Sequence, residues 1–125
     1  MYRDPPGTPS HYSCPDCGGV LWRGGDPLDA DLRCRVGHAY SFQALERGQR
    51  DGVEAALWTA LRALEENAIT ARRLAEDSRL ADRQLAAGRF AARQAQAERQ
   101  AAVIRGALTD GEEAPQVTTG RAAIA

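Results

Sequence analysis

The sequence has no long apolar run, no strong net charge and no signal segment. Its 125 residues carry a formal net charge of −1, and no run approaches the ~18 apolar residues that a membrane span needs. A near-neutral chain creates no strong field toward nucleic acid or a membrane surface. Residues 1–10 lack the apolar stretch that routes a chain to an oxidising compartment. We therefore expect a cytoplasmic protein that does not contact a membrane.

Cysteine is scarce, but its placement is informative. All three cysteines fall in one short stretch, spaced Cys14-x2-Cys17, then sixteen residues, then Cys34-x3-His38. Zinc prefers four sulfur or nitrogen donors in a tetrahedron, and two short loops can supply two donors each. The spacing predicts a closed Cys3His structural site that holds Zn²⁺ through Cys14, Cys17, Cys34 and His38. Gly18 or Gly19 and then Gly37 lie where these loops need positive φ.

Other interpretations of the cysteines remain open. Three thiols can be small buried hydrophobes, or two of them can form a disulfide, although a disulfide framework favours an even count and a secreted context. His11 competes for the place of fourth ligand because His11-x2-Cys14 is also a short spacing. If His11 were the fourth ligand, His38 would have no role in the site although its spacing from Cys34 is that of a ligand pair.

The residues around the cysteines predict a zinc ribbon over residues 11–40, after a disordered leader at residues 1–10. Two short strands, near residues 19–22 and 32–36, flank a turn at residues 24–27 that is marked by glycine and proline. So small a module needs the metal for much of its folding free energy. We expect its core to contain Val20, Trp22, Val36 and Tyr40. The alternative is that these side chains form an exposed contact patch.

From residue 41 the pattern becomes helical, which predicts a mainly α chain with a helical hairpin over residues 41–108. Ser41 is a suitable N-cap for a short helix at 41–49, and Asp51 with Glu54 has capping-box spacing for a second start. The helix predicted at about 52–77 carries an apolar stripe with Trp58 on its flank, and we take this stripe as core. Its members are Val53, Leu57, Leu61, Leu64, Ala68, Ala71 and Ala75.

A second helix is predicted at about 78–108, with a disordered tail at 109–125. Its periodicity is poorer, and Gly88 costs ~1 kcal/mol or marks a bend. Antiparallel pairing with the first helix is the favoured arrangement, and a frayed or partner-dependent helix is the alternative. On one continuous helix, five arginines would share a broad face, which we interpret as solvated rather than as a phosphate-binding surface. They are Arg79, Arg83, Arg89, Arg93 and Arg105.

Three segments together resemble a known family. They read CPDCGGVLW, RCRVGHAYS and AALWTALRALEE. Over roughly residues 10–80 the chain resembles the C-terminal extension of bacterial chemotaxis-type protein-glutamate methylesterases, and the four predicted ligands match the metal positions of that extension. The family's esterase activity resides in a preceding α/β domain with a Ser-His-Asp site, and these residues contain no G-x-S-x-G elbow. No catalytic residue carries over, so we expect no enzyme.

Three functions fit these features. The first is a non-catalytic zinc-binding module in chemotaxis-like signalling, which contacts a protein partner or a second copy through its helices. The second is a nucleic-acid-binding zinc ribbon with an arginine-rich helix, although residues 11–40 have no basic excess. The third is a zinc-thiolate redox switch, in which Arg33 and Arg35 raise the reactivity of Cys34.

Overall fold

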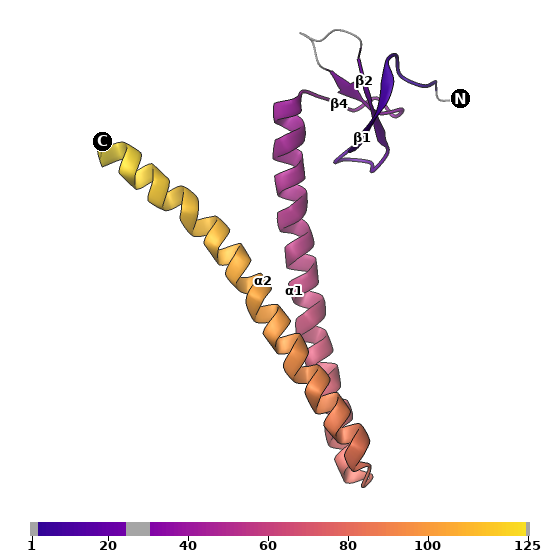
Figure 1. Cartoon of the computed structure of the whole chain (residues 1–125), viewed down its shortest axis with the longest axis vertical. Coiled ribbons are helices and arrows are strands. Elements are labelled where there is room, and N and C mark those ends of the chain that lie inside the picture. The colour runs from indigo at the N-terminus through magenta and orange to yellow at the C-terminus, as the bar shows by residue number, and fades with distance from the viewer. Residues whose placement is uncertain (1–2, 25–30, 125) are drawn as a thin grey trace. The chain divides into compact units, whose positions relative to one another are not determined.

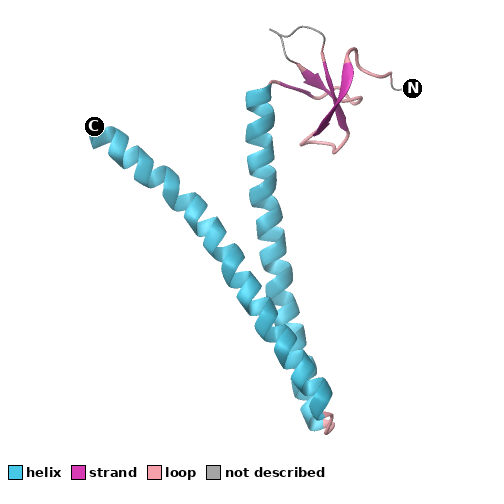
Figure 2. Cartoon of the chain, viewed as in Figure 1, coloured by secondary structure: helices cyan, strands magenta, loops and turns pink. Residues whose placement is uncertain are grey.

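A computed structural model describes the backbone of residues 3–24 and 31–124, and the side chains of those up to Asp110. The chain divides into two units, Met1–Val53 and Glu54–Ala125. As predicted, it is mainly helical, with two long helices and a small sheet (Figures 1 and 2). The elements are β1 (Thr8–Ser13), β2 (Val20–Arg23), β3 (Leu32–Arg33), β4 (Ala39–Tyr40), α1 (Phe42–Leu80) and α2 (Gln84–Ile124).

The sheet of the first unit is antiparallel, with the strand order β1-β2-β3-β4. The prediction of two strands was therefore wrong, and so was the assignment of residues 8–10 to a disordered leader. β1 pairs with β2 with Thr8 opposite Arg23 and Pro9 opposite Trp22. Proline is compatible with this position because β1 is an edge strand, where one side of the backbone needs no partner. The turn predicted at residues 24–27 lies largely outside the described residues, although the amide of Gly24 donates to the carbonyl of Asp31 at 3.0 Å.

The core of the first unit is centred on leucines that were not expected there. Leu21, Leu32 and Leu45 are its largest fully buried side chains, and of the residues expected, Tyr40 packs against them. Val20 and Val36 are 52% and 58% exposed, so their assignment to the core was wrong. For Val20 the reason is the two-residue period of a strand, because Leu21 points inward and its neighbour in β2 must then point outward. Val36 lies in the loop between β3 and β4.

α1 begins where the sequence indicates. The amide of Ala44 donates to Ser41 Oγ at 3.1 Å, and the amide of Leu45 donates to the Ser41 carbonyl at 2.8 Å, so Ser41 is the N-cap. The predicted break near residue 50 is absent, and residues 42–80 form one helix. Asp51 and Glu54, which have capping-box spacing, lie inside this helix. No proline lies here to interrupt its hydrogen bonds.

A tight link joins α1 to α2. Asp82 has φ of 58°, and the amide of Arg83 donates to the Ser78 carbonyl at 2.8 Å. α2 therefore begins at Gln84, later than the predicted start at 78. It continues to Ile124, where the sequence predicts a disordered tail after Leu108. The predicted arginine face does not form on one helix, because Arg79 belongs to α1 and Arg83 to the link.

In the second unit α1 and α2 form the predicted hairpin. Its core combines Leu61 with Ala101 and Leu108, and Leu57, Leu64 and Ile104 pack against them. Trp58, however, is 50% exposed, so it lies beside this core rather than in it. Neither helix, over the residues described, has a stretch long and apolar enough to cross a membrane.

Candidate metal centre

The first pair of predicted ligands lies in a tight loop between β1 and β2. Cys14 directly follows β1, its amide donates to the Gly19 carbonyl at 2.7 Å, and its carbonyl accepts from the amide of Gly18 at 2.8 Å. Gly18 has φ of 76°, which favours glycine. These bonds reverse the chain between the two cysteines, so that Cys14 and Cys17 project toward the same point.

A second loop, between β3 and β4, repeats this construction. The amide of Cys34 donates to the His38 carbonyl at 3.0 Å, and the amide of Gly37 donates to the Cys34 carbonyl at 3.1 Å. Gly37 has φ of 113°, as predicted for a residue in this turn. The amide of His38 also donates to Cys34 Sγ at 3.3 Å, a contact that the sequence gives no means of predicting.

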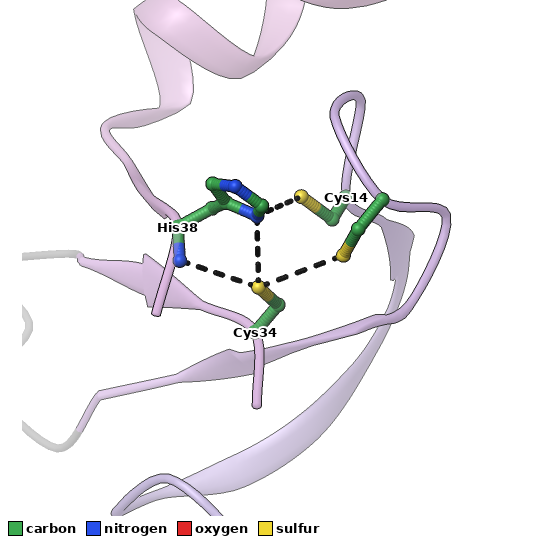
Figure 3. A group of neighbouring side chains, drawn as sticks. Cys14, Cys34 and His38 are labelled. Atoms are coloured by element: carbon green, nitrogen blue, oxygen red, sulfur yellow. Dashed lines mark hydrogen bonds between the residues drawn. The ribbon is translucent and has the colours of Figure 1, made fainter. Parts of the chain in front are cut away.

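The two loops bring the four predicted ligands together. His38 Nδ1 lies 3.6 Å from Cys14 Sγ and 3.4 Å from Cys34 Sγ, while the sulfurs of Cys17 and Cys34 are 3.7 Å apart (Figure 3). All four donor atoms lie within 4.8 Å of one another, an arrangement that could hold a metal ion. His11, the competing candidate, is exposed on β1 and is not a member of this group.

The thiols of the group differ in acidity. Burial opposes ionisation of Cys34, but hydrogen bonds from the backbone amides of His38, Gly37 and Val36 and from the Cys17 thiol outweigh it and lower its pKa to about 6. At Cys17 a hydrogen bond from the Gly19 amide favours the thiolate. Desolvation and the neighbouring Cys14 and Cys34 together outweigh that bond and raise the Cys17 pKa. Thus at neutral pH Cys34 offers a thiolate, whereas Cys17 must lose a proton to bind a cation.

The surroundings of the group are partly closed. Cys14 and Cys34 are buried and Cys17 is exposed. The hydroxyl of Tyr40 donates to Asp16 in the first loop, and this bond raises the pKa of Tyr40. Tyr40 thereby connects β4 to the turn between Cys14 and Cys17, a tie that the sequence analysis missed. A hollow of about 400 Å³ adjoins Cys17, lined mainly by Val20, Trp22, Val36 and Arg35.

Comparison of the chain with protein-family models, curated proteins and solved structures found no match.

Proposed function

We propose that this protein is a cytoplasmic zinc ribbon with a helical hairpin, a non-catalytic module that acts by contacting another protein. The spacing of the four donor atoms supports this most directly. A tetrahedral ion with bonds of about 2.3 Å to sulfur and about 2.0–2.1 Å to nitrogen separates two sulfurs by about 3.8 Å, and sulfur from nitrogen by about 3.5 Å. Three of the six donor pairs have such separations, with 3.7 Å between the sulfurs of Cys17 and Cys34 and 3.4–3.6 Å from His38 Nδ1 to the sulfurs of Cys34 and Cys14, and all four atoms lie within 4.8 Å of one another. These separations support zinc as the ion.

The small core of the first unit supports a structural role for the ion. Its three fully buried leucines contribute about 1.5–3 kcal/mol each, which is less than the cost of ordering the segments that surround them. Structural zinc sites supply about 10–16 kcal/mol of apparent binding free energy to folding. In this proposal Zn²⁺ therefore supplies the missing stability, and Cys14, Cys17, Cys34 and His38 hold it.

The donor set also argues against catalysis. Catalytic zinc sites use three protein ligands and keep a fourth position for water or substrate. Here four protein donors surround one point, so a bound ion has no place for a reacting molecule. We therefore propose that the protein is not an enzyme.

Exposed apolar side chains favour the protein-contact role. Val36 on the first unit, and Trp58 and Ile69 on the hairpin, are half or more exposed. The separation of Arg79 from α2 removes part of the surface that the nucleic-acid alternative needs. A place in chemotaxis-like signalling rests on the resemblance of residues 10–80 to the methylesterase extension.

The experiment that tests this proposal compares two histidine variants. His38→Ala removes a proposed ligand, while His11→Ala removes the nearby histidine that lies outside the group. On purified full-length protein we expect one zinc per chain for the wild type and His11→Ala. For His38→Ala we expect weak or no binding and loss of sheet signals in NMR spectra. Equal zinc content and equal folding of both variants would refute the proposal.

A second candidate, the redox switch, is favoured by the exposure of Cys17. Its sulfur lies 3.7 Å from Cys34 Sγ. A peroxide could oxidise these two thiolates to a disulfide, with release of zinc and reduction of the peroxide to water or an alcohol. Rapid zinc release under mild peroxide, reversed by a thiol reductant and added zinc, would support this role. Zinc retention under peroxide would exclude it.

A further inference from the structure

α1 carries two apolar or uncharged seams side by side, and only one of them is covered. The covered seam repeats at intervals of four and three residues and faces α2. Its members are Leu57, Leu61, Leu64, Ala68, Ala71 and Ala75, each of them buried or half-buried. Alternating steps of four and three are the spacing of a coiled-coil seam. The hairpin thus uses this repeat for its own core.

The open seam has the same spacing and begins one residue earlier. Its members are Ala56, Ala60, Ala63, Asn67, Thr70 and Leu74. None of them is charged, and all except the half-buried Ala60 are exposed. The hydroxyl of Thr70 donates to the carbonyl of Glu66 at 3.0 Å, so this residue can present its methyl group without an unsatisfied donor. The seam therefore has the composition of a helix interface.

α2 completes this surface as the second wall of a groove. The groove has a volume of about 540 Å³ and is lined by Ala60, Ala63, Leu64, Gln100, Val103 and Ile104, none of which is charged. Val103 is 72% exposed at its edge. On α2, Gln96 and Ala107 continue this side at helical spacing and are uncharged, whereas Arg89 and Arg93 continue it toward the start of the helix and carry positive charge.

Most charged side chains of α1 alongside the open seam lie on other sides of the helix. They are Glu54, Arg62, Glu65, Glu66, Arg72, Arg73 and Glu76, all exposed. At 100° per residue these positions lie away from the open seam. The uncharged seam ends at Leu74, because the next position of the repeat is Asp77, which pairs with Arg73 at 3.1 Å. The absence of charge from the open seam is thus not a general property of this alanine-rich helix. It is confined to one face.

We propose that the occupant of this groove is a second copy of the same chain, so that two hairpins form a four-helix bundle. The proposal rests on the proposed protein-contact function and names its partner and surface. Residues 54–110 hold nine arginines and eight acidic residues, so the hairpin is almost neutral. It therefore does not attract a strongly charged partner, and two copies of it do not repel each other. An uncharged heptad seam matches a helix with the same repeat, which the second copy supplies.

Asn67 supports self-pairing in particular. Its amide offers both donors and an acceptor, so it can bond the identical residue of a second copy across a two-fold axis. A single asparagine in a heptad seam commonly fixes register and oligomeric state in this way. The alanines of the open seam also allow two helices to approach closely.

The test measures native mass by sedimentation equilibrium on the zinc-loaded full-length protein. Ala63→Glu and Val103→Glu place a charge in the groove. Ala55→Glu and Ala102→Glu place the same charge at exposed positions outside it. We expect a dimer for the wild type and both controls, and association weaker by at least about tenfold for both groove variants. A wild type that stays monomeric, or groove variants that dimerise as tightly as the controls, would overturn the proposal.

Two further measurements keep the result interpretable. Far-UV circular dichroism establishes that each variant retains its helices, and Thr70→Arg, a better helix former, replaces any glutamate variant that does not. Zinc content is measured on the same samples. A zinc-loaded monomer would overturn the self-pairing and leave the proposed function intact. A dimer without zinc would support the self-pairing and refute the zinc proposal.

Discussion

Gly48 of α1 lies against the ring of Pro15 in the first metal-binding loop. A Cβ at Gly48 would lie 3.0 Å from Cγ and 3.2 Å from Cβ of that ring, whereas a Cβ at Gly52, one turn later, would meet nothing within 4 Å. Glycine therefore lets the helix approach the loop that presents Cys14 and Cys17. This contact lies within the first unit, where Leu45 also joins the core.

Alanine substitutions at the two glycines should thus differ in effect. Gly52→Ala is expected to raise the free energy of unfolding by about 0.5–1 kcal/mol, because alanine has less conformational freedom to lose in a helix. Gly48→Ala should raise the free energy of unfolding by clearly less, because the new Cβ must displace the ring of Pro15. Chemical denaturation of the zinc-loaded protein, followed by a signal from Trp22 in the sheet, measures both. Equal gains at the two positions would show that the Pro15 contact is not close.

The candidate metal group could be predicted because it depends on local spacing. Two residues between Cys14 and Cys17, and a glycine in each loop, are properties of short segments that a sequence displays directly. The core of the first unit could not be predicted in the same way. The prediction placed Val20 in the core, where the structure has Leu21. This shift of one residue exchanges the buried and the exposed face of the strand. Leu45, moreover, reaches that core from a different element.

The helices show a similar contrast. The stripe through Leu57, Leu61 and Leu64 does face α2, because leucines mark a core seam clearly. The matching seam of α2 went unnoticed in the sequence, since it is built largely from alanines such as Ala97 and Ala101, which also occupy the exposed faces of this helix. Alanine gives helix propensity but little contrast between faces. The link between α1 and α2 turns at Asp82, which has a positive φ although it is not a glycine. No glycine therefore marks this turn in the sequence.

Zinc affinity should fall as the pH is lowered, because protons compete for the ligands. Cys34 has a pKa of about 6, below the ordinary thiol value of 9.0. In the metal-free chain its ionisation therefore contributes stability that is full above about pH 9 and is lost as pH falls through about 6. The pKa of Cys17 is raised, so its effect on stability has the opposite dependence on pH. Its neutral thiol contributes stability to the metal-free chain below about pH 9.

For zinc binding, this predicts proton release at neutral pH that includes the proton of Cys17, and a steeper loss of affinity below about pH 6, where Cys34 also takes up a proton. Competition with a chromophoric chelator between about pH 5 and about pH 8 measures the effect. His11→Ala serves as the control and should follow the same curve as the wild type. Affinity that is constant or rises on acidification would contradict thiolate ligation.

The ion pair between Arg105 and Glu65 joins α2 to α1 across the hairpin at 2.8 Å. Both side chains are at least half exposed, so water and salt screen their attraction. A double-mutant cycle with Arg105→Ala and Glu65→Ala should give a coupling energy below about 1 kcal/mol, which disappears at high salt. Thermal denaturation at two salt concentrations measures it. A larger, salt-insensitive coupling would mean that the pair becomes buried, as in an assembly that covers it.

Asn67→Leu is expected to tighten self-association and to reduce its specificity. In the proposed bundle this amide is the one side chain of the open seam that needs a hydrogen-bond partner once buried, and leucine replaces that need with apolar contact. We therefore expect a lower dissociation constant and the appearance of species larger than a dimer in sedimentation velocity. Ile69→Leu, a change at an exposed position outside the open seam, should leave the dissociation constant and the size of the assembly unchanged. If Asn67→Leu associates no more tightly than the wild type, the residue does not lie between the two copies, and another face of the hairpin must carry the contact.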